Sequence, residues 1–470
     1  MCDADSQSHF LRSSGRYPLT GRGDVNTYQV FAELARGLPS DRGRAGAIVP
    51  TGIATDYTNR DFFADLVDRG QLASLFDFEN KRGLFPEVHR KQKFSLLTLR
   101  GPALTPAQFA FFLLDADELS QSDKTFSLTA ADFARLNPNT KTCPVFRSRV
   151  DAKLTRKLYA AAPVLVNEET GENSWGVSFL RMFDMTNDSG LFRTHEQLQA
   201  EGFTLHGNHF VRGDEVYLPL YEGKLTQIHD HRFTTFANLP EEEIRKGNPR
   251  PLTQQEHFSA ITIALPRFWV SNSDIKRQLN DQVLPSNWLT FHDIANPNNE
   301  RTFISTICPA HGMGNTLPVV SSNLGVVTVV LVSGNLNTFV FDYASRLKAG
   351  SRHMNFFIVK QLPVLPPDRY TPDLLVYIVP RVLELTYTAW DLRAFADDVW
   401  SDAGQESTGA EVRRGKISNL QQAILRQWEE NRDTTHGGHE GAVPPAWAEE
   451  QSHREASLKS RGAPLPQTAI

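Results

Sequence analysis

The densest run of polar side chains lies in the segment YEGKLTQIHDHR, residues 221–232. If QIHDHRF forms a strand, His229 and His231 point to one face, because side chains alternate along a strand. Two imidazoles on one face can chelate a metal ion, but the sequence places no third ligand beside them. We therefore predict no metal site here, and the run remains a candidate binding segment.

Further polar residues of the kinds that contact DNA follow downstream. Arginine and asparagine can each read a base through two hydrogen bonds, and serine or threonine hydroxyls suit phosphates. The candidates are Arg181, Asn187, Asp188, Arg301, Thr302, Ser351, Arg352, His353 and Asn355. Because arginine and asparagine in mixed domains more often lie in turns or surface ion pairs, we expect a minority of them to touch DNA.

A basic segment lies upstream of these candidates. FRSRVDAKLTRKLYAAAP, residues 146–163, predicts an amphipathic helix with Val150, Leu154 and Leu158 facing the core. Arg149 and Lys153 then lie on the neighbouring face, where cations can meet phosphates. The alternative is that this face is simply solvated.

Three aromatic residues beside the polar candidates raise the question of base stacking. Tyr221, Phe356 and Phe357 sit in apolar runs, so we expect them in the core.

Other catalytic signatures are missing from the sequence: it contains no Walker lysine loop, no HExxH and no GxSxG. HGMG, residues 311–314, is interpreted as a loop, and GRG, residues 21–23, as a turn.

The bulk composition indicates a globular protein. The chain has 470 residues, of which 40% are hydrophobic, and this length predicts two or three domains. No run reaches the roughly 18 apolar residues that a membrane span needs, and the N-terminus lacks a signal-peptide core, so we expect a cytoplasmic protein. Its three cysteines are expected to be reduced. The net charge of −5 does not indicate a nucleic-acid binder.

The elements that position these residues begin with an α/β region. Residues 45–54, 72–80 and 93–101 predict strands, and residues 26–38 and 61–70 predict helices. A doubly wound domain needs more strands than these, so the sheet looks open at its N-terminal side. Residues 101–144 are interpreted as a connector with a helical piece at 106–119.

A strand-rich region follows. Between residues 175 and 370 we expect strands in six runs: VSFLRMFDM, EVYLPLYEG, AITIALPRFWV, RTFISTICPA, VVTVVLVSG and NFFIVKQLPVL. Residues 373–400 predict one or two helices, broken or kinked at Pro380. Beyond residue 401 we expect one helical piece, at 416–432, and a flexible tail from about residue 433.

Several long segments resemble large adenine-N6 DNA methyltransferases of type IIG restriction-modification, BREX and DISARM-like defence systems. SGRYPLTGRGDVNTYQVFAELARG, GAIVPTGIATD and FENKRGLFPEVHRKQKFSLLTLRG are similar to the part of the class I methyltransferase fold after the catalytic loop. WGVSFLRMFDMTNDSGLF, YLPLYEGKLTQIHDHRF and SRHMNFFIVKQLPVLPP are similar to the target-recognition region.

The resemblance implies a fold and a division of the chain. The fold class is α/β plus α+β: an incomplete Rossmann-like methyltransferase sheet, then a mixed target-recognition domain and C-terminal helices. We expect the methyltransferase part at 1–100, the connector at 101–144, the recognition domain at 145–400, and a helical piece with a flexible tail at 401–470. Residues 221–232 would pack at the domain junction or approach DNA, with Lys224, His231 and Arg232 as contacts.

The resemblance also implies a cofactor and partners. Members of the family bind S-adenosylmethionine on a glycine-rich loop and flip the target adenine against an Asn-Pro-Pro-aromatic loop. Neither loop is present here: LNPNT and ANPNN lack the second proline and the aromatic residue. We therefore expect a DNA-recognition portion that binds double-stranded DNA, holds no S-adenosylmethionine by itself and is completed by a separate chain. The alternatives are a stand-alone DNA-binding protein and an inert gene fragment.

Overall fold

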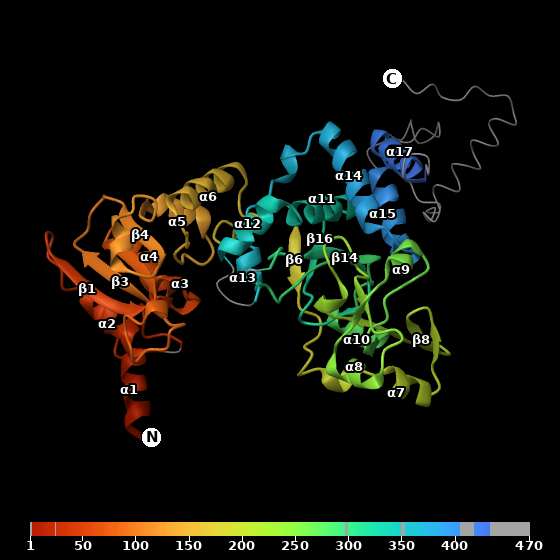
Figure 1. Cartoon of the computed structure of the whole chain (residues 1–470), viewed down its shortest axis with the longest axis horizontal. Coiled ribbons are helices and arrows are strands. Elements are labelled where there is room, and N and C mark those ends of the chain that lie inside the picture. The colour runs from red at the N-terminus through yellow and green to blue at the C-terminus, as the bar shows by residue number, and fades with distance from the viewer. Residues whose placement is uncertain (1, 24, 297–298, 349–352, 405–417, 433–470) are drawn as a thin grey trace, which may run out of the picture. The chain divides into compact units, whose positions relative to one another are not determined.

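The computed structural model describes residues 2–23, 25–296, 299–348, 353–404 and 418–432 (Figure 1). The chain divides into two compact units, Met1–Asn173 with Phe357–Leu365, and Ser174–Phe356 with Pro366–Ile470. Both units mix helices and strands, which confirms the α/β plus α+β class. The boundary expected between residues 144 and 145 falls inside the first unit.

The N-terminal unit is built around one five-stranded sheet. Its elements are α1 (Cys2–Ser13), α2 (Thr27–Arg36), β1 (Arg44–Pro50), α3 (Gly52–Thr55), α4 (Arg60–Asp68), β2 (Leu72–Glu79), β3 (Lys93–Arg100), β4 (Ala107–Leu113), β5 (Phe126–Leu128), α5 (Ala130–Leu136) and α6 (Arg149–Ala161). The strand order is β1-β3-β2-β4-β5, in which only β2 and β4 run parallel. The strands and helices expected before residue 101 are confirmed.

Strand β4 corrects the interpretation of the connector. The helical piece expected at 106–119 is wrong, because residues 107–113 pair with both β2 and β5 inside the sheet. The segment AQFAFFL buries Phe109, Phe111 and Leu113 on alternate positions, which is the period of a strand. Aromatic residues also favour the pleated surface of a sheet.

Helix α6 forms where it was expected, but with a different buried face. Ser148 caps it by accepting a hydrogen bond from the Asp151 amide at 3.1 Å. Its buried residues are Ala152, Thr155 and Tyr159, and the Tyr159 hydroxyl donates to the Gln361 carbonyl at 2.8 Å. Val150 and Leu154, the expected core positions, are 69% and 41% exposed. The expected core face is therefore wrong, because the face that carries Tyr159, whose hydroxyl bonds to Gln361, turns inward instead.

The C-terminal unit contains two larger sheets and a group of helices. Its elements are β6 (Val177–Leu180), α7 (His195–Ala200), β7 (Thr204–His206), β8 (His209–Arg212), β9 (Glu215–Tyr221), β10 (Thr234–Thr235), α8 (Glu241–Lys246), β11 (Arg250–Pro251), α9 (Gln254–Phe258), β12 (Trp269–Ser271), α10 (Asn272–Gln278), β13 (Asn287–Phe291), β14 (Ser305–Pro309), β15 (Gly312–Met313), β16 (Val319–Ser322), α11 (Val326–Leu336), α12 (Phe339–Lys348), α14 (Pro372–Thr386), α15 (Arg393–Ala403) and α17 (Asn419–Arg432). One sheet has the order β14-β13-β16-β6, and the other β12-β9-β8-β7 with β15 beside β9.

Two runs expected to be strands are helical. VVTVVLVSG lies in α11, and part of NFFIVKQLPVL forms α13 (Phe356–Val359). The Asp402 carboxylate accepts a hydrogen bond from the Val327 amide at 2.8 Å, which satisfies a free N–H at the start of α11. Because α11 is packed between β14, β16, α14 and α15, burial overrides the strand preference of its valines. AITIALPRFWV forms a strand only at its end, in β12.

The C-terminal helices are not broken at Pro380, where a break was expected. Helix α14 continues through Pro380, and the chain leaves the helix only at Tyr387, before α15. Within the residues described here, no single helix meets the length and hydropathy needed to cross a membrane; α11 and α12 meet them only as a pair bent by 66°.

Candidate functional site

Two of the predicted DNA-contacting residues converge on one carboxylate in the C-terminal unit. The Arg181 guanidinium lies 3.5 Å from Oδ1 of Asp293, and Nδ1 of His353 lies 2.7 Å from Oδ2 of the same residue. The Asp293 side chain is 7% exposed, whereas those of Arg181 and His353 are 44% and 53% exposed. The buried acid therefore holds two basic groups at the surface. We call Arg181, Asp293 and His353 the arginine–histidine cluster.

The backbone around the cluster fixes Asp293 in place. Arg181 directly follows β6, and Asp293 lies two residues after β13. The Asp293 amide donates to the Thr316 carbonyl at 3.1 Å, and its carbonyl accepts from the Met354 amide at 2.6 Å. The Arg181 guanidinium also lies 5.7 Å from the centre of the Phe356 ring. The cluster thus joins Asp293 to residues 112 and 60 positions away in the chain, and no local sequence pattern signals the role of Asp293.

Asn187 lies on an exposed turn of the same unit. The amides of Thr186 and Asn187 donate to Oδ1 of Asp184 at 2.9 and 2.8 Å. These bonds lower the pKa of Asp184, so the turn holds a carboxylate that stays ionised. Asp188 belongs to this turn, because its carboxylate accepts from the Asp184 amide. Asn187 itself is exposed and accessible to a ligand.

His231 and Arg232 do not fit the prediction of DNA contact, because both side chains are completely buried. Nε2 of His231 bonds to Oδ1 of Asp391 at 2.9 Å. The Arg232 guanidinium donates to five backbone carbonyls, those of Glu256, His257, Ser259, Thr262 and Thr388. Arg232 therefore ties a loop and a helix end together inside the fold.

The segment QIHDHRF does not form a strand. Gln227 and Asp230 form an isolated bridge across a turn, and His229 has a positive φ of 57°. His229 and His231 therefore do not share a strand face, so the premise for paired imidazoles is lost. Across the described residues, no group of three histidine, cysteine, aspartate or glutamate side chains has the geometry to hold a metal ion.

Three further candidates are engaged within the C-terminal unit. Lys224 donates to the Gly247 carbonyl at 2.9 Å and lies 3.2 Å from the Glu222 carboxylate. Arg301 donates to the Asn337 carbonyl at 3.2 Å and stacks on Phe339. Thr302 is 3% exposed, and its amide donates to Asp342. Burial removes Thr302 from the accessible candidates.

The remaining candidates lie in different places. Arg149 and Lys153 are exposed on α6 of the N-terminal unit, where Arg149 donates to the Thr125 carbonyl at 3.1 Å. Asn355 is half-buried and adjoins the arginine–histidine cluster in sequence. Ser351 and Arg352 lie outside the described residues.

The aromatic expectations hold only in part. Tyr221 is fully buried and Phe356 is half-buried, whereas Phe357 is 41% exposed, so the expected core position of Phe357 is wrong.

Several buried polar atoms of the C-terminal unit have no hydrogen-bond partner. They belong to Tyr221, His231, His311 and Asp391, which lie around one another. Burial lowers the pKa of His311 to about 3, so this ring is neutral at physiological pH. Nothing in the local sequence around Asp391 signals its pairing with His231, 160 residues away.

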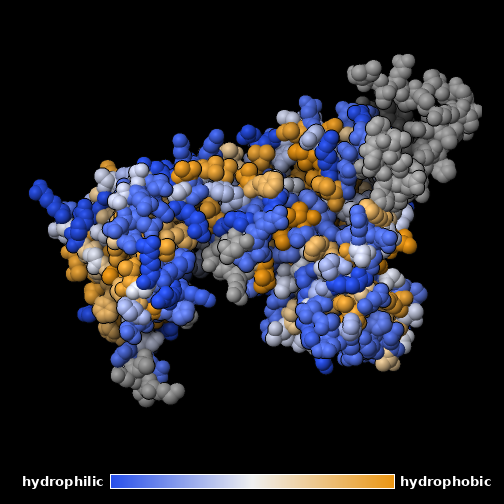
Figure 2. All heavy atoms as spheres, viewed as in Figure 1, coloured by the Kyte–Doolittle hydropathy of each residue, from blue (hydrophilic) through white to orange (hydrophobic). Residues whose placement is uncertain are grey.

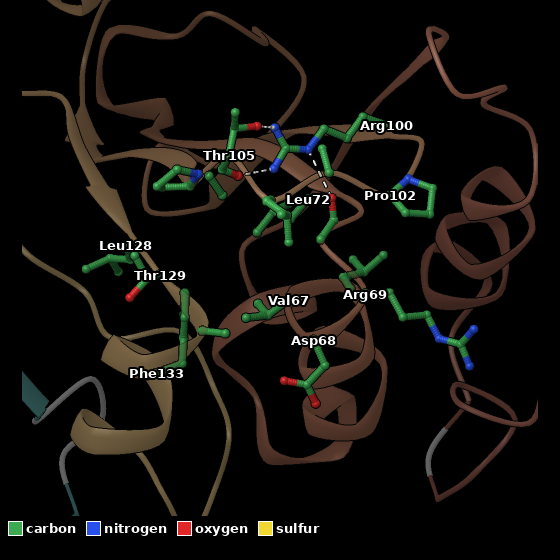
Figure 3. Close-up of a pocket in the computed structure, with 17 residues that line it drawn as sticks. Val67, Asp68, Arg69, Leu72, Arg100, Pro102, Thr105, Leu128, Thr129 and Phe133 are labelled. Carbon is green, nitrogen blue, oxygen red and sulfur yellow. Dashed lines mark hydrogen bonds between the residues drawn. The ribbon is translucent and has the colours of Figure 1, made fainter.

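The N-terminal unit contains a pocket of about 330 Å³ beside β2 and β3. Leu66 is one of its lining residues, and Leu72, Thr129 and Phe133 also line it (Figure 3). Arg100 also lines it, but its guanidinium bonds to the Gly70 carbonyl at 3.0 Å and to Thr105. Because the fold uses this cation, the pocket offers a ligand mainly apolar walls.

The chain has a structural similarity to a solved structure but no match to a family profile or a curated protein. No protein-family profile matches the sequence, and no curated protein matches it. Among solved structures, the chain is similar to one described as the type IIG restriction endonuclease BpuSI, with 14% identity and a TM-score of 0.31. The alignment covers 92% of this chain and 53% of that chain, so this chain spans about half its length. A TM-score of this size does not establish a common fold.

Proposed function

We propose that this chain binds double-stranded DNA as the recognition portion of a site-specific adenine-N6 DNA methyltransferase in a restriction-modification or phage-defence system. The observation that carries the proposal is the arginine–histidine cluster. Arg181 keeps an exposed guanidinium and His353 an exposed ring, while the buried carboxylate of Asp293 contacts both. Such a preorganised guanidinium suits phosphate oxygens or base edges.

The resemblance of the sequence to target-recognition regions supports the same function. Arg181 lies in WGVSFLRMFDMTNDSGLF and His353 in SRHMNFFIVKQLPVLPP, two separate segments that carry this resemblance. Asn187 and Asn355 come from the same two segments. Residues from both segments therefore supply the candidate DNA contacts.

Methyl transfer requires parts that the printed sequence does not contain. We propose that a separate cytoplasmic polypeptide supplies the loop for S-adenosylmethionine and the Asn-Pro-Pro-aromatic loop. This chain would then determine where the methyl group is placed. The alternative is a stand-alone DNA-binding protein, which would bind DNA without any such polypeptide.

Binding of the purified chain to duplex DNA across a salt series tests the proposal. We expect affinity to fall steeply with salt and methyl transfer by this chain alone to be absent. Arg181→Ala should weaken binding about tenfold and reduce the salt slope by about one. The matched control is Arg212→Ala. Arg212 is an exposed arginine on β8 that forms an ion pair with Glu215.

Two outcomes would contradict the proposal. A folded chain that binds no DNA at low salt excludes a recognition function. Equal losses of affinity in Arg181→Ala and Arg212→Ala would show that general charge, and not the arginine–histidine cluster, determines binding. S-adenosylmethionine is added in a parallel series, where methylation by this chain alone would overturn the assignment of catalysis to another polypeptide.

A further inference from the structure

The pocket beside β2 and β3 contains a buried cation without a counter-charge. Arg100 lines the pocket and is 6% exposed, and among the residues that the structure describes no carboxylate pairs with its guanidinium. Burial and the neighbouring charge of Arg44 lower the pKa of Arg100. Buried charges in proteins are normally paired, because a lone charge is costly to remove from water. A lone buried charge at the wall of a pocket therefore indicates an anionic ligand.

Hydrogen bonds position this guanidinium but do not neutralise it. Its Nε donates to the Gly70 carbonyl at 3.0 Å, and its two terminal nitrogens donate to the hydroxyl and carbonyl of Thr105 (Figure 3). All three acceptors are uncharged. A guanidinium has five N–H donors, so two remain after these three bonds. Arg100 can therefore offer two donors and its positive charge to a ligand.

A second cation lies on the neighbouring strand. Arg44 of β1 is the register partner of Arg100 in β3. Like charges directly opposite each other destabilise a sheet, so this pair favours an anion nearby. Asp65 of α4 does not meet that need, because its carboxylate already forms ion pairs with Arg36 and Arg69.

The rest of the pocket is apolar and preformed. Leu72, Leu128 and Phe133 line it and are buried. Gly70 lies so close to the loop at Ala103 that an added Cβ would meet the Ala103 carbonyl oxygen at 2.1 Å, which fixes this part of the wall. Because a cavity of roughly 150 Å³ holds benzene, the volume of about 330 Å³ suits a body on the order of ten carbon atoms.

The charges around the pocket give the ligand a direction. The face of the N-terminal unit that Figure 2 draws carries both hydrophobic and hydrophilic residues, so apolar walls alone do not distinguish this pocket from the surface. Asp68 also lines the pocket, but it is exposed and lies on the side away from Arg100 (Figure 3). An anionic group should therefore lie toward Arg100 and away from Asp68.

We propose that this pocket binds a small amphipathic carboxylate. Its apolar body packs against Leu72, Leu128 and Phe133, and its carboxylate accepts hydrogen bonds from the Arg100 guanidinium. A single uncompensated charge matches a monoanion, and arginine is the side chain whose geometry best suits a carboxylate. Binding places the missing counter-charge beside Arg100 and removes apolar wall from water.

Titration calorimetry of the full chain with three ligands tests the role of the charge. Octanoate, octanol and octylammonium share one apolar body and differ in the charge of the head group. We expect one octanoate per chain, with octanol at least about tenfold weaker and octylammonium weaker still. Absence of octanoate binding at about 5 mM overturns the proposal. Octanol or octylammonium binding as tightly as octanoate overturns it too.

Removal of the cation tests the anchor. Arg100→Met deletes the charge and keeps an unbranched side chain, so octanoate should lose its advantage over octanol. Arg44→Met is the matched control, because Arg44 is exposed and is not among the residues that line the pocket. It should bind octanoate within about twofold of the wild type. Equal losses in the two variants, or unchanged octanoate binding in folded Arg100→Met, contradict the anchor.

A second variant tests the location without touching the hydrogen bonds of Arg100. Ala130 lines the pocket and is exposed, so Ala130→Trp should fill the pocket and abolish octanoate binding while the melting temperature stays unchanged. Ala131→Trp, at the next position, which is exposed and does not line the pocket, should bind octanoate normally. Normal binding in Ala130→Trp overturns the location. No titration contains DNA, so the proposed function stands or falls separately.

Discussion

The N-terminal unit exposes large apolar side chains beside the edge of β1, whereas the C-terminal unit buries charged and polar side chains in its core. Phe31 and Ile48 are more than half exposed, and His231 and Arg232 are completely buried. Either feature departs from the usual division between an apolar interior and a polar surface. The exposed apolar side chains of the N-terminal unit indicate a surface for a binding partner. The buried polar side chains of the C-terminal unit affect the stability of its fold.

The two units also differ in how fully the buried polar groups compared here find hydrogen-bond partners. In the N-terminal unit, the buried carboxylate of Asp77 accepts hydrogen bonds from the hydroxyls of Thr51 and Ser95. In the C-terminal unit, both ring nitrogens of His311 lack a partner. An unsatisfied buried polar group costs more than a satisfied one. The C-terminal unit should therefore be more sensitive to changes in its polar core.

The largest effect is expected from removing the buried guanidinium. Arg232→Ala removes the guanidinium donors to five backbone carbonyls and opens a cavity, so we expect a loss on the order of 4 kcal/mol in the free energy of unfolding. Urea unfolding followed by tryptophan fluorescence measures it. Arg212→Ala, an exposed arginine of the same unit, should cost less than 1 kcal/mol. Similar costs for the two variants would refute the structural role of Arg232.

An intermediate effect is expected from acidification of the C-terminal unit. Burial lowers the pKa of His292 to about 4, so the unfolded chain takes up a proton that the folded chain refuses. The stability that His292 contributes is thus present above the unfolded pKa of 6.5 and is lost as the pH falls toward 4, by about 2 kcal/mol at pH 5, and the buried His311 ring, with a pKa of about 3, adds a loss of the same sign. Urea unfolding at pH 7.5 and pH 5 measures this loss, and His292→Gln should reduce it. An unchanged pH dependence in the variant would contradict the buried neutral ring.

The smallest effect is expected from the apolar surface of the N-terminal unit. Leu34→Ser changes a side chain that is 55% exposed on α2. We expect a change within about 0.5 kcal/mol in the free energy of unfolding. Thermal unfolding of the variant and the wild type measures this small term. A large destabilisation would show that Leu34 belongs to the core and not to a surface for a binding partner.

The sequence predicted the N-terminal elements because their patterns are local. β1, β2 and β3 are short apolar runs ended by turn residues, and α2 and α4 have helical periodicity. The sequence also singled out Arg181 and His353 as candidates for DNA contact, and the structure exposes both side chains. The sequence missed Asp293, because the contact that gives this residue its role joins segments distant in the chain.

Tertiary packing decided the remaining features. The valine-rich segment of α11 became a helix because neighbouring elements enclose it, and 107–113 became strand β4 because β2 and β5 offered hydrogen-bonding partners on both sides. Arg232 looked like a cation for DNA, yet five carbonyls from distant residues surround it. Periodicity and composition by themselves determine which segments have a strong local preference. Burial and long-range pairing decide the others, because their free energies depend on neighbours that local sequence does not specify.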